Sequence, residues 1–214
     1  MTMAGPTLEG IARVLHPLRR PPTGEGWNLD ELHDLLPDAR VHAEAGVLVG
    51  LVGRDDGLRV VLTLRNENLR HHPGQVSFPG GRVEPADADA LAAALREAAE
   101  EIGLATSQVE PLGFLDPLLT VSGFRVLPAV ARISPDFIAR PDPGEVAEVF
   151  EVPLAWLLAE TSLERIAIEY RGRERQVLQF RSDPLCTPHR IWGATASILF
   201  NLRERLAALR EAAA

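Results

Sequence analysis

Three glutamates at helical spacing are the residues in this chain best suited to chemistry. Glu97, Glu100 and Glu101 stand at positions i, i+3 and i+4 of the stretch ALREAAEEIGL, so a helix would place their carboxylates on one side. Like charges at these spacings weaken a helix by about 0.2–0.5 kcal/mol per pair. A hard divalent cation such as Mg²⁺ or Mn²⁺ would offset this repulsion, because such ions bind carboxylate oxygens. An acidic face that is merely solvated is the alternative.

The stretch that must position these glutamates covers residues 80–104. It begins with a glycine pair and a short polar loop, and continues as an alanine-rich helix that we expect to stop at Gly103. Leu91, Leu95, Ala98 and Ile102 fall in a narrow sector of this helix, roughly opposite the three glutamates. The pattern therefore predicts one face that packs and another that presents three carboxylates.

The sequence around the glutamates resembles a known motif. Arg96 and the eight residues after it read R-E-A-A-E-E-I-G-L, with Gly81 upstream. This resembles the second half of the Nudix box, G-x5-E-x7-R-E-U-x-E-E-x-G-U, where U is bulky or apolar. The resemblance implies a metal site formed by Glu97, Glu100, Glu101 and the carbonyl of Gly81. It also implies catalytic roles for Glu97, Glu100 and Arg96, with Arg96 orienting the carboxylates.

The first half of the box departs from the pattern by one residue. Fifteen positions separate Gly81 from Arg96, where the pattern has fourteen. Counting forward from Gly81 places the first glutamate of the box on Asp87, and counting back from Arg96 places it on Ala88. Its role falls to Asp87, to Asp89 or to no residue, and the sequence leaves this open.

A second resemblance lies just upstream, in LTLRNENLRHHPGQVSFPGG at residues 62–81. It is similar to the signature of the coenzyme A pyrophosphatase branch of the Nudix superfamily, L-L-T-x-R-S-x-x-L-R-x-H-x-G-Q-V-x-F-P-G-G, with Asn66 in place of the usual serine. That branch also carries the longer spacing in the box. We assign phosphate recognition to Arg65, Arg70 and His72, because arginine suits bidentate contact with phosphate. Surface solvation is the alternative for the two arginines, and an ordinary loop or core histidine is the alternative for His72.

Three residues outside these motifs are also candidates for the site. The stretch 145–154 resembles an E-V-x-x-V-F-x-x-P-L segment of the same branch, so Glu145 and Glu148 are candidates for an acid that completes the metal site or orients water. Solvated loop carboxylates are the alternative. Trp192 lies in a similar I-W-G-x-T-A segment, where we expect it to be a core residue rather than a platform for substrate stacking.

Three functions compete. The leading hypothesis is metal-dependent cleavage of coenzyme A or its derivatives to adenosine 3′,5′-bisphosphate and 4′-phosphopantetheine. The second hypothesis is a Nudix hydrolase that acts on ADP-ribose or another nucleoside diphosphate derivative. The third is a catalytically silent, Nudix-like ligand-binding module, against which the intact Glu97, Glu100 and Glu101 argue.

Composition and charge indicate which partners and which compartment to expect. The chain has 214 residues, a net charge of -8 and a pI near 5.3, so it lacks the basic surplus that nonspecific nucleic-acid binding needs. Cys186 is the single cysteine, which fits a reducing compartment. No signal peptide or membrane span is evident. We expect a cytoplasmic protein with no membrane partner and a small nucleotide as substrate. A homodimer is compatible with the sequence.

Periodicity and turn residues outline the remaining elements. They predict helices at 7–15 and 28–36, the second with Asn28 as N-cap, and strands at 41–53, 58–64, 109–119 and 124–133. A short strand and helix between 144 and 159, a hairpin at 166–170 and 176–180, and a helix from 191 to about 213 follow. We expect one domain over 1–214, with an N-terminal helical extension of about 1–37. The resemblance implies the Nudix fold, an α/β/α sandwich with a mixed β-sheet and a loop-helix catalytic motif.

Overall fold

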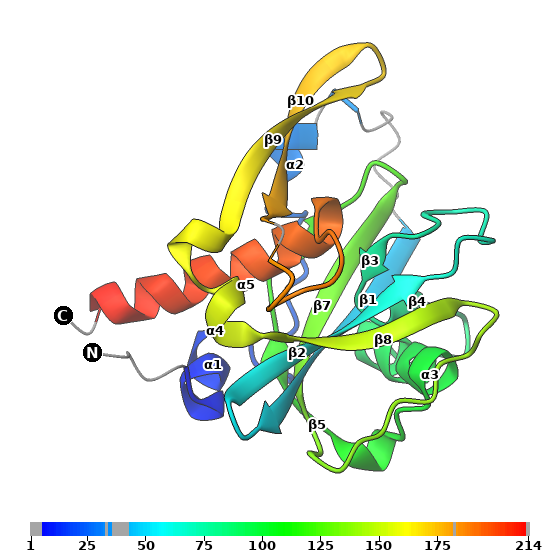
Figure 1. Cartoon of the computed structure of the whole chain (residues 1–214), viewed down its shortest axis with the longest axis vertical. Helices are drawn as coiled ribbons and strands as arrows, with labels where there is room; N and C mark the ends of the chain where they lie inside the picture. Colours follow the sequence, from blue (N-terminus) through cyan, green and yellow to red (C-terminus); the bar gives the residue numbers. More distant parts are fainter. Residues whose placement is uncertain (1–5, 33, 36–42, 182, 213–214) are drawn as a thin grey trace.

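A mixed sheet forms the centre of the molecule (Figure 1). The computed structural model describes residues 6–32, 34–35, 43–181 and 183–212. The main path of the sheet has the order β3-β2-β1-β7-β5. Its strands are β1 (Ala43–Arg54), β2 (Gly57–Arg65), β3 (Val76–Ser77), β5 (Val109–Phe114) and β7 (Phe124–Ile133). Off this path, β4 (Gly80–Arg82) pairs with β1, β6 (Leu118–Leu119) with β7 and β8 (Val146–Pro153) with β2.

The sheet is mixed because β1 and β7 run parallel whereas the other pairs are antiparallel. Helix α3 (Ala90–Ile102) covers one face, and α1 (Leu8–Val14), α4 (Leu154–Leu157) and α5 (Gly193–Ala212) cover the other. In β1, Leu48 and Val52 pack toward α3, and Val49 and Leu51 pack toward α5. The strand is apolar on both sides because both of its faces are buried. The predicted α/β/α sandwich with a mixed sheet is confirmed.

Local signals set the ends of α3. The side chain of Asp89 accepts a hydrogen bond from the backbone N–H of Ala92 and caps the first turn. Gly103 ends the helix in the left-handed conformation, with φ of 69°, which glycine adopts without steric cost. The predicted stop at Gly103 is confirmed.

Two expectations about the elements are wrong. The helix predicted at 28–36 is a single turn, α2 (Leu29–Leu32), with residues 33 and 36 outside the described part. Asn28, predicted as its N-cap, contacts β6 through its side chain. The Asn28 amide instead donates to the carbonyl of Leu119 at 2.9 Å and accepts from the Leu119 N–H at 2.8 Å, so it extends the ladder of β6. The strand predicted at 109–119 is divided into β5 and β6.

The other elements match their predictions closely. Residues 41–42 of the first predicted strand lie outside the described part, and the rest of that strand is β1. The predicted hairpin is β9 (Leu163–Tyr170) with β10 (Arg173–Phe180), which extends away from the main sheet (Figure 1). Two short 3₁₀ turns, η1 (Thr106–Gln108) and η2 (Glu160–Ser162), complete the list. In α5 the apolar stripe includes buried Leu199, Leu202 and Leu206, and the side chain of Leu209 lies outside the described part.

A polar cluster ties the N-terminal extension to the body. His16 Nε2 lies 2.7 Å from Asp116 Oδ1, and Arg205 of α5 donates to both carboxylate oxygens of Asp116 at 2.9 and 3.0 Å. Burial would raise the pKa of Asp116, but hydrogen bonds from His16, Asn201 and Arg205 hold it below its usual range. Within the described residues, no helix is long and apolar enough to cross a membrane.

Candidate active site

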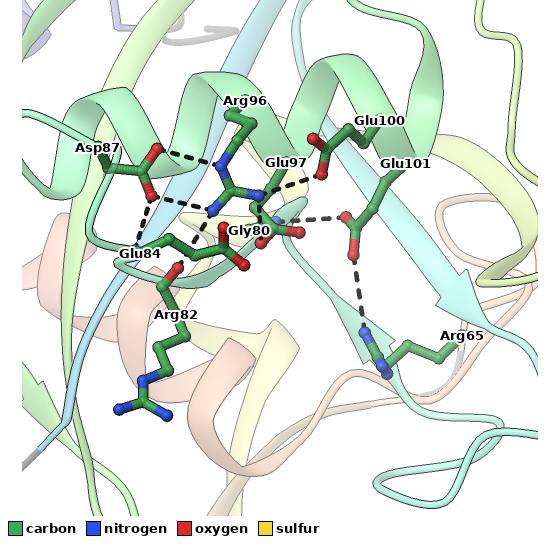
Figure 2. A network of polar contacts seen from close by, with 9 residues as sticks. All are labelled: Arg65, Gly80, Arg82, Glu84, Asp87, Arg96, Glu97, Glu100 and Glu101. Carbon is green, nitrogen blue, oxygen red and sulfur yellow. Dashed lines mark hydrogen bonds and ion pairs between the residues drawn. The ribbon is translucent and has the colours of Figure 1, made fainter.

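The three glutamates of α3 occupy different environments (Figure 2). The side chain of Glu100 is 60% exposed, that of Glu97 is 18% exposed and that of Glu101 is 3% exposed. The expectation that all three project from a face opposite the packed one is therefore wrong for Glu101. The last turn of α3 packs against the sheet more broadly than the periodicity suggested, and Ala98, Glu101 and Ile102 are all buried there.

Glu101 faces the end of β2. Its Oε2 accepts a hydrogen bond from the backbone N–H of Gly80 at 3.3 Å, and its Oε1 lies 3.7 Å from Arg65 Nη1. Burial raises the pKa of Glu101 to about 7. The charge of Arg65 opposes this shift, and the charges of Glu97 and Glu145 add to it. Glu101 is therefore a desolvated carboxylate, and its neighbours compensate its negative charge only in part.

Glu97 lies over the glycine pair. A Cβ atom at Gly81 would stand only 2.3 Å from Glu97 Oε1, so the absence of a side chain at Gly81 leaves room for this carboxylate. Burial raises the pKa of Glu97 even though Arg96 donates to it at 2.9 Å, and the charges of Glu100 and Glu145 act in the same direction as burial. Glycine at position 81 therefore allows strand β4 and helix α3 to lie this close together.

Arg96 connects the loop with the acids. Its Nη1 donates to Glu97 and to Glu100, at 2.9 and 3.1 Å, and its Nη2 donates to the carbonyl of Arg82 at 3.2 Å. Its Nε and Nη2 each donate to Asp87 at 3.0 Å, which makes a bidentate pair (Figure 2). The predicted orienting role of Arg96 has this geometric basis, because one guanidinium touches two of the three glutamates.

Asp87 is a residue whose role the one-residue insertion left open. Its carboxylate holds Arg96 and also accepts the N–H of Glu84 at 2.8 Å, while Asp89 serves as the N-cap of α3. Hydrogen bonds from Arg96, followed by the N–H of Glu84, keep the pKa of Asp87 below its usual range. The same contacts raise the pKa of Arg96, so this pair stays ionised.

The basic residues predicted to bind phosphate are distributed unevenly. Arg65 lies beside Glu101, and its Nε is buried without a hydrogen-bond partner among the described residues. Arg70 and His72 are exposed in the loop between β2 and β3, where His72 Nδ1 lies 3.2 Å from Gln75 Oε1. Neither shows an ion pair with an α3 carboxylate.

Glu145 and Glu148, the two candidate acids outside the box, also lie in different surroundings. The carbonyl of Glu145 accepts the N–H of Asn66, and its charge acts on both Glu97 and Glu101. Glu148 instead pairs with His189, at 2.8 Å between Oε2 and Nε2. Glu145 therefore adds to the negative charge felt by Glu97 and Glu101, whereas Glu148 is paired with His189. Trp192 is half-buried rather than a fully buried core residue.

A divalent cation can be tested against these residues. Within the described ranges, no three Asp, Glu, His or Cys side chains converge on a common point, and the α3 carboxylates instead pair with Arg96 and Arg65. The donor set still has the right chemistry, since carboxylate and carbonyl oxygens are the ligands that hard cations prefer. The incompletely compensated charge of Glu97 and Glu101 and the Nε of Arg65, which has no hydrogen-bond partner among the described residues, also fit a site for a cation and an anion together.

Comparisons with known proteins point to one family. Residues 44–171 match the family model described as NUDIX domain. A protein of Escherichia coli K12, described as uncharacterized Nudix hydrolase NudL, is 42% identical over 162 residues, which cover 75% of this chain and 81% of that protein. A protein of the same description from Photorhabdus laumondii is 38% identical over 147 residues, covering 69% and 76%. The crystal structure of a MutT/nudix family protein from Enterococcus faecalis shares the fold, with a TM-score of 0.51 and 19% identity over 81% of this chain and 65% of that one.

Proposed function

This chain belongs to the Nudix family, whose members hydrolyse phosphoanhydride bonds, and we propose that its substrate is coenzyme A or one of its derivatives. Nudix hydrolases act on nucleoside diphosphate derivatives and generally use divalent metal ions. The proposed products are adenosine 3′,5′-bisphosphate and 4′-phosphopantetheine. The proposed cation is Mg²⁺ or Mn²⁺.

The observation that carries this proposal is the position of Arg65. This residue belongs to the segment that resembles the coenzyme A pyrophosphatase signature, and it reaches the buried Glu101 of the box across the end of β2. Its buried Nε has no partner among the described residues, and such a group gains when a phosphate oxygen accepts its hydrogen bond. The signature segment and the acid helix therefore support a single site.

The site residues would divide the chemistry among them. Glu97, Glu100, Glu101 and the carbonyl of Gly81 would hold the metal ion. When bound, a divalent cation supplies positive charge to the diphosphate oxygens and lowers the pKa of a water molecule. Water attacks one phosphorus, the bridging P–O bond breaks, and the leaving phosphate departs with the bridging oxygen.

The other side chains bind and orient. Arg65 donates to the diphosphate from the end of β2, and Arg70 and His72 bind phosphate from the loop between β2 and β3. Arg96, held by Asp87, fixes the rotamers of Glu97 and Glu100. A carboxylate of α3 or Glu145 accepts the proton of the attacking water. We propose Glu145 for the acid outside the box because its charge reaches both Glu97 and Glu101.

The test is cleavage of coenzyme A against ADP-ribose at equal concentration, with Mg²⁺ and with Mn²⁺, followed by chromatography of the products. The proposal predicts faster cleavage of coenzyme A and equal amounts of adenosine 3′,5′-bisphosphate and 4′-phosphopantetheine. Faster cleavage of ADP-ribose would refute coenzyme A as the substrate but would still support a hydrolase. Binding of both compounds without turnover of either would favour the ligand-binding module.

A further inference from the structure

The segment that runs from the β9–β10 hairpin into the first turn of α5 crosses the end of β2, at the same sheet edge as Arg65. His189 contacts Glu148 of β8 at 2.8 Å, and Thr195 Oγ1 donates to the carbonyl of Val76 in β3 at 2.8 Å. Both strands flank β2, and the register pairs Leu64 with Glu148 on one side and with Val76 on the other. Residues 189–195, called here the bridging segment, therefore span about 10 Å across the strand, one position before Arg65.

The bridging segment lies on the face opposite α3. Val76, Phe150 and Ile191 belong to the core on the α5 side, and the start of α5 lies beside β3 (Figure 1). The α3 carboxylates approach the same edge from the other side through Arg65 and Glu101. A substrate held at the carboxylates can therefore extend over this edge toward the bridging segment.

Arg190 is the cation that the bridging segment exposes. Its guanidinium stacks on the ring of Trp192, with 4.8 Å from Cζ to the ring centroid, and its Nε donates to Gln179 Oε1. Gln179 is itself oriented, because its amide nitrogen donates to Glu164 at 3.2 Å. Among the described residues no carboxylate forms an ion pair with Arg190. An exposed guanidinium that is held in place and not neutralised is suited to bind a phosphate.

We propose that Arg190, presented by Trp192 and Gln179, binds a phosphomonoester carried by the nucleoside of the substrate, separate from the diphosphate that is cleaved. This inference rests on the proposed function, since coenzyme A carries such a group on its ribose. Arg65 would then contact the diphosphate, and Arg190 would contact the second anionic group across the sheet edge. Trp192 and Gln179 act through Arg190 and are positioning residues.

The first experiment measures binding without turnover. Isothermal titration of adenosine 3′,5′-bisphosphate and of adenosine 5′-monophosphate into the wild-type chain is expected to show a preference for the bisphosphate of about 10- to 100-fold, the effect of one charged hydrogen-bonded contact. Arg190→Gln should reduce this preference to near unity, and Arg190→Lys should keep part of it. Trp192→Phe should keep more of it than Trp192→Ala.

Arg171→Gln is the matched control, because Arg171 also stacks on an aromatic ring, that of Tyr170, at the hairpin tip far from α3 (Figure 1). This variant should keep the full preference. Equal binding of the two nucleotides by the wild-type chain, or an unchanged preference in Arg190→Gln, would overturn the assignment.

The second experiment separates this inference from the proposed function. It compares kcat/KM for coenzyme A and for 3′-dephospho-coenzyme A in the wild-type chain and in Arg190→Gln. The ratio should fall by about 10- to 100-fold in the variant, a change that a general loss of structure would not produce. Absence of coenzyme A cleavage with an intact, Arg190-dependent preference for the bisphosphate would refute the proposed function alone. Efficient cleavage with the same ratio in both chains would refute the role of Arg190 alone.

Discussion

Gly81→Ala tests the position of Glu97 without changing any charged group. The added Cβ would stand 2.3 Å from Glu97 Oε1 and 2.5 Å from Glu97 Cδ, where ordinary contact begins at 3.4 Å. The carboxylate must therefore move by about 1 Å. The three nearest atoms to this Cβ all belong to the carboxyl group, which ends a flexible side chain and can move without a shift of the backbone.

The displacement predicts a large kinetic effect and a small effect on folding. A misplacement of about 1 Å in a catalytic constellation can cost roughly 100-fold in rate, which corresponds to about 2.7 kcal/mol in the activation barrier. We expect kcat for coenzyme A to fall by this factor, while the Tm measured by circular dichroism changes by only a few degrees.

Gly53→Ala is the control, since a Cβ there would meet nothing within 4 Å and the backbone is not left-handed. It should leave both kcat and Tm close to wild type. A Gly81→Ala enzyme with nearly normal kcat would show that this placement of Glu97 is not required for turnover. The role of Glu97 in the acid cluster would then have to be revised.

Glu97, Arg70, the proposed cation and Asp116 can each be tested separately. Glu97→Gln should abolish turnover and keep the fold, because it removes a ligand charge without removing volume, and near-normal activity would contradict the metal assignment. Arg70→Ala should raise KM more than it lowers kcat, and the reverse pattern would argue against phosphate binding. EDTA should stop cleavage, and added Mg²⁺ or Mn²⁺ should restore it; turnover that EDTA does not affect would exclude the proposed cation. The lowered pKa of Asp116 stabilises the fold above the ordinary aspartate pKa, and this stability is lost as pH falls through the folded-state pKa. Thermal unfolding of Asp116→Asn should accordingly depend less on pH in the acid range, and an unchanged profile would exclude this linkage.

The sequence alone determined the local parts of this protein. The stop of α3, the course of β7 and the hairpin of β9 and β10 follow from turn residues and periodicity, which act over a few positions. The motif residues around Glu97 indicated the family, because their spacing is fixed by one helix. The fold class followed from that resemblance.

Only the tertiary structure decided what depends on distant segments. Periodicity grouped Glu101 with Glu100, but the packing of the last turn of α3 against the sheet buries Glu101 and leaves Glu100 exposed. The insertion before α3 left Asp87 undecided until the loop placed it on Arg96. Side-chain alternation could not show that Glu148 would meet His189, since that contact joins residues 41 positions apart. The environment of each charged group is set by register and packing across the sheet, and neither is encoded in a short stretch of sequence.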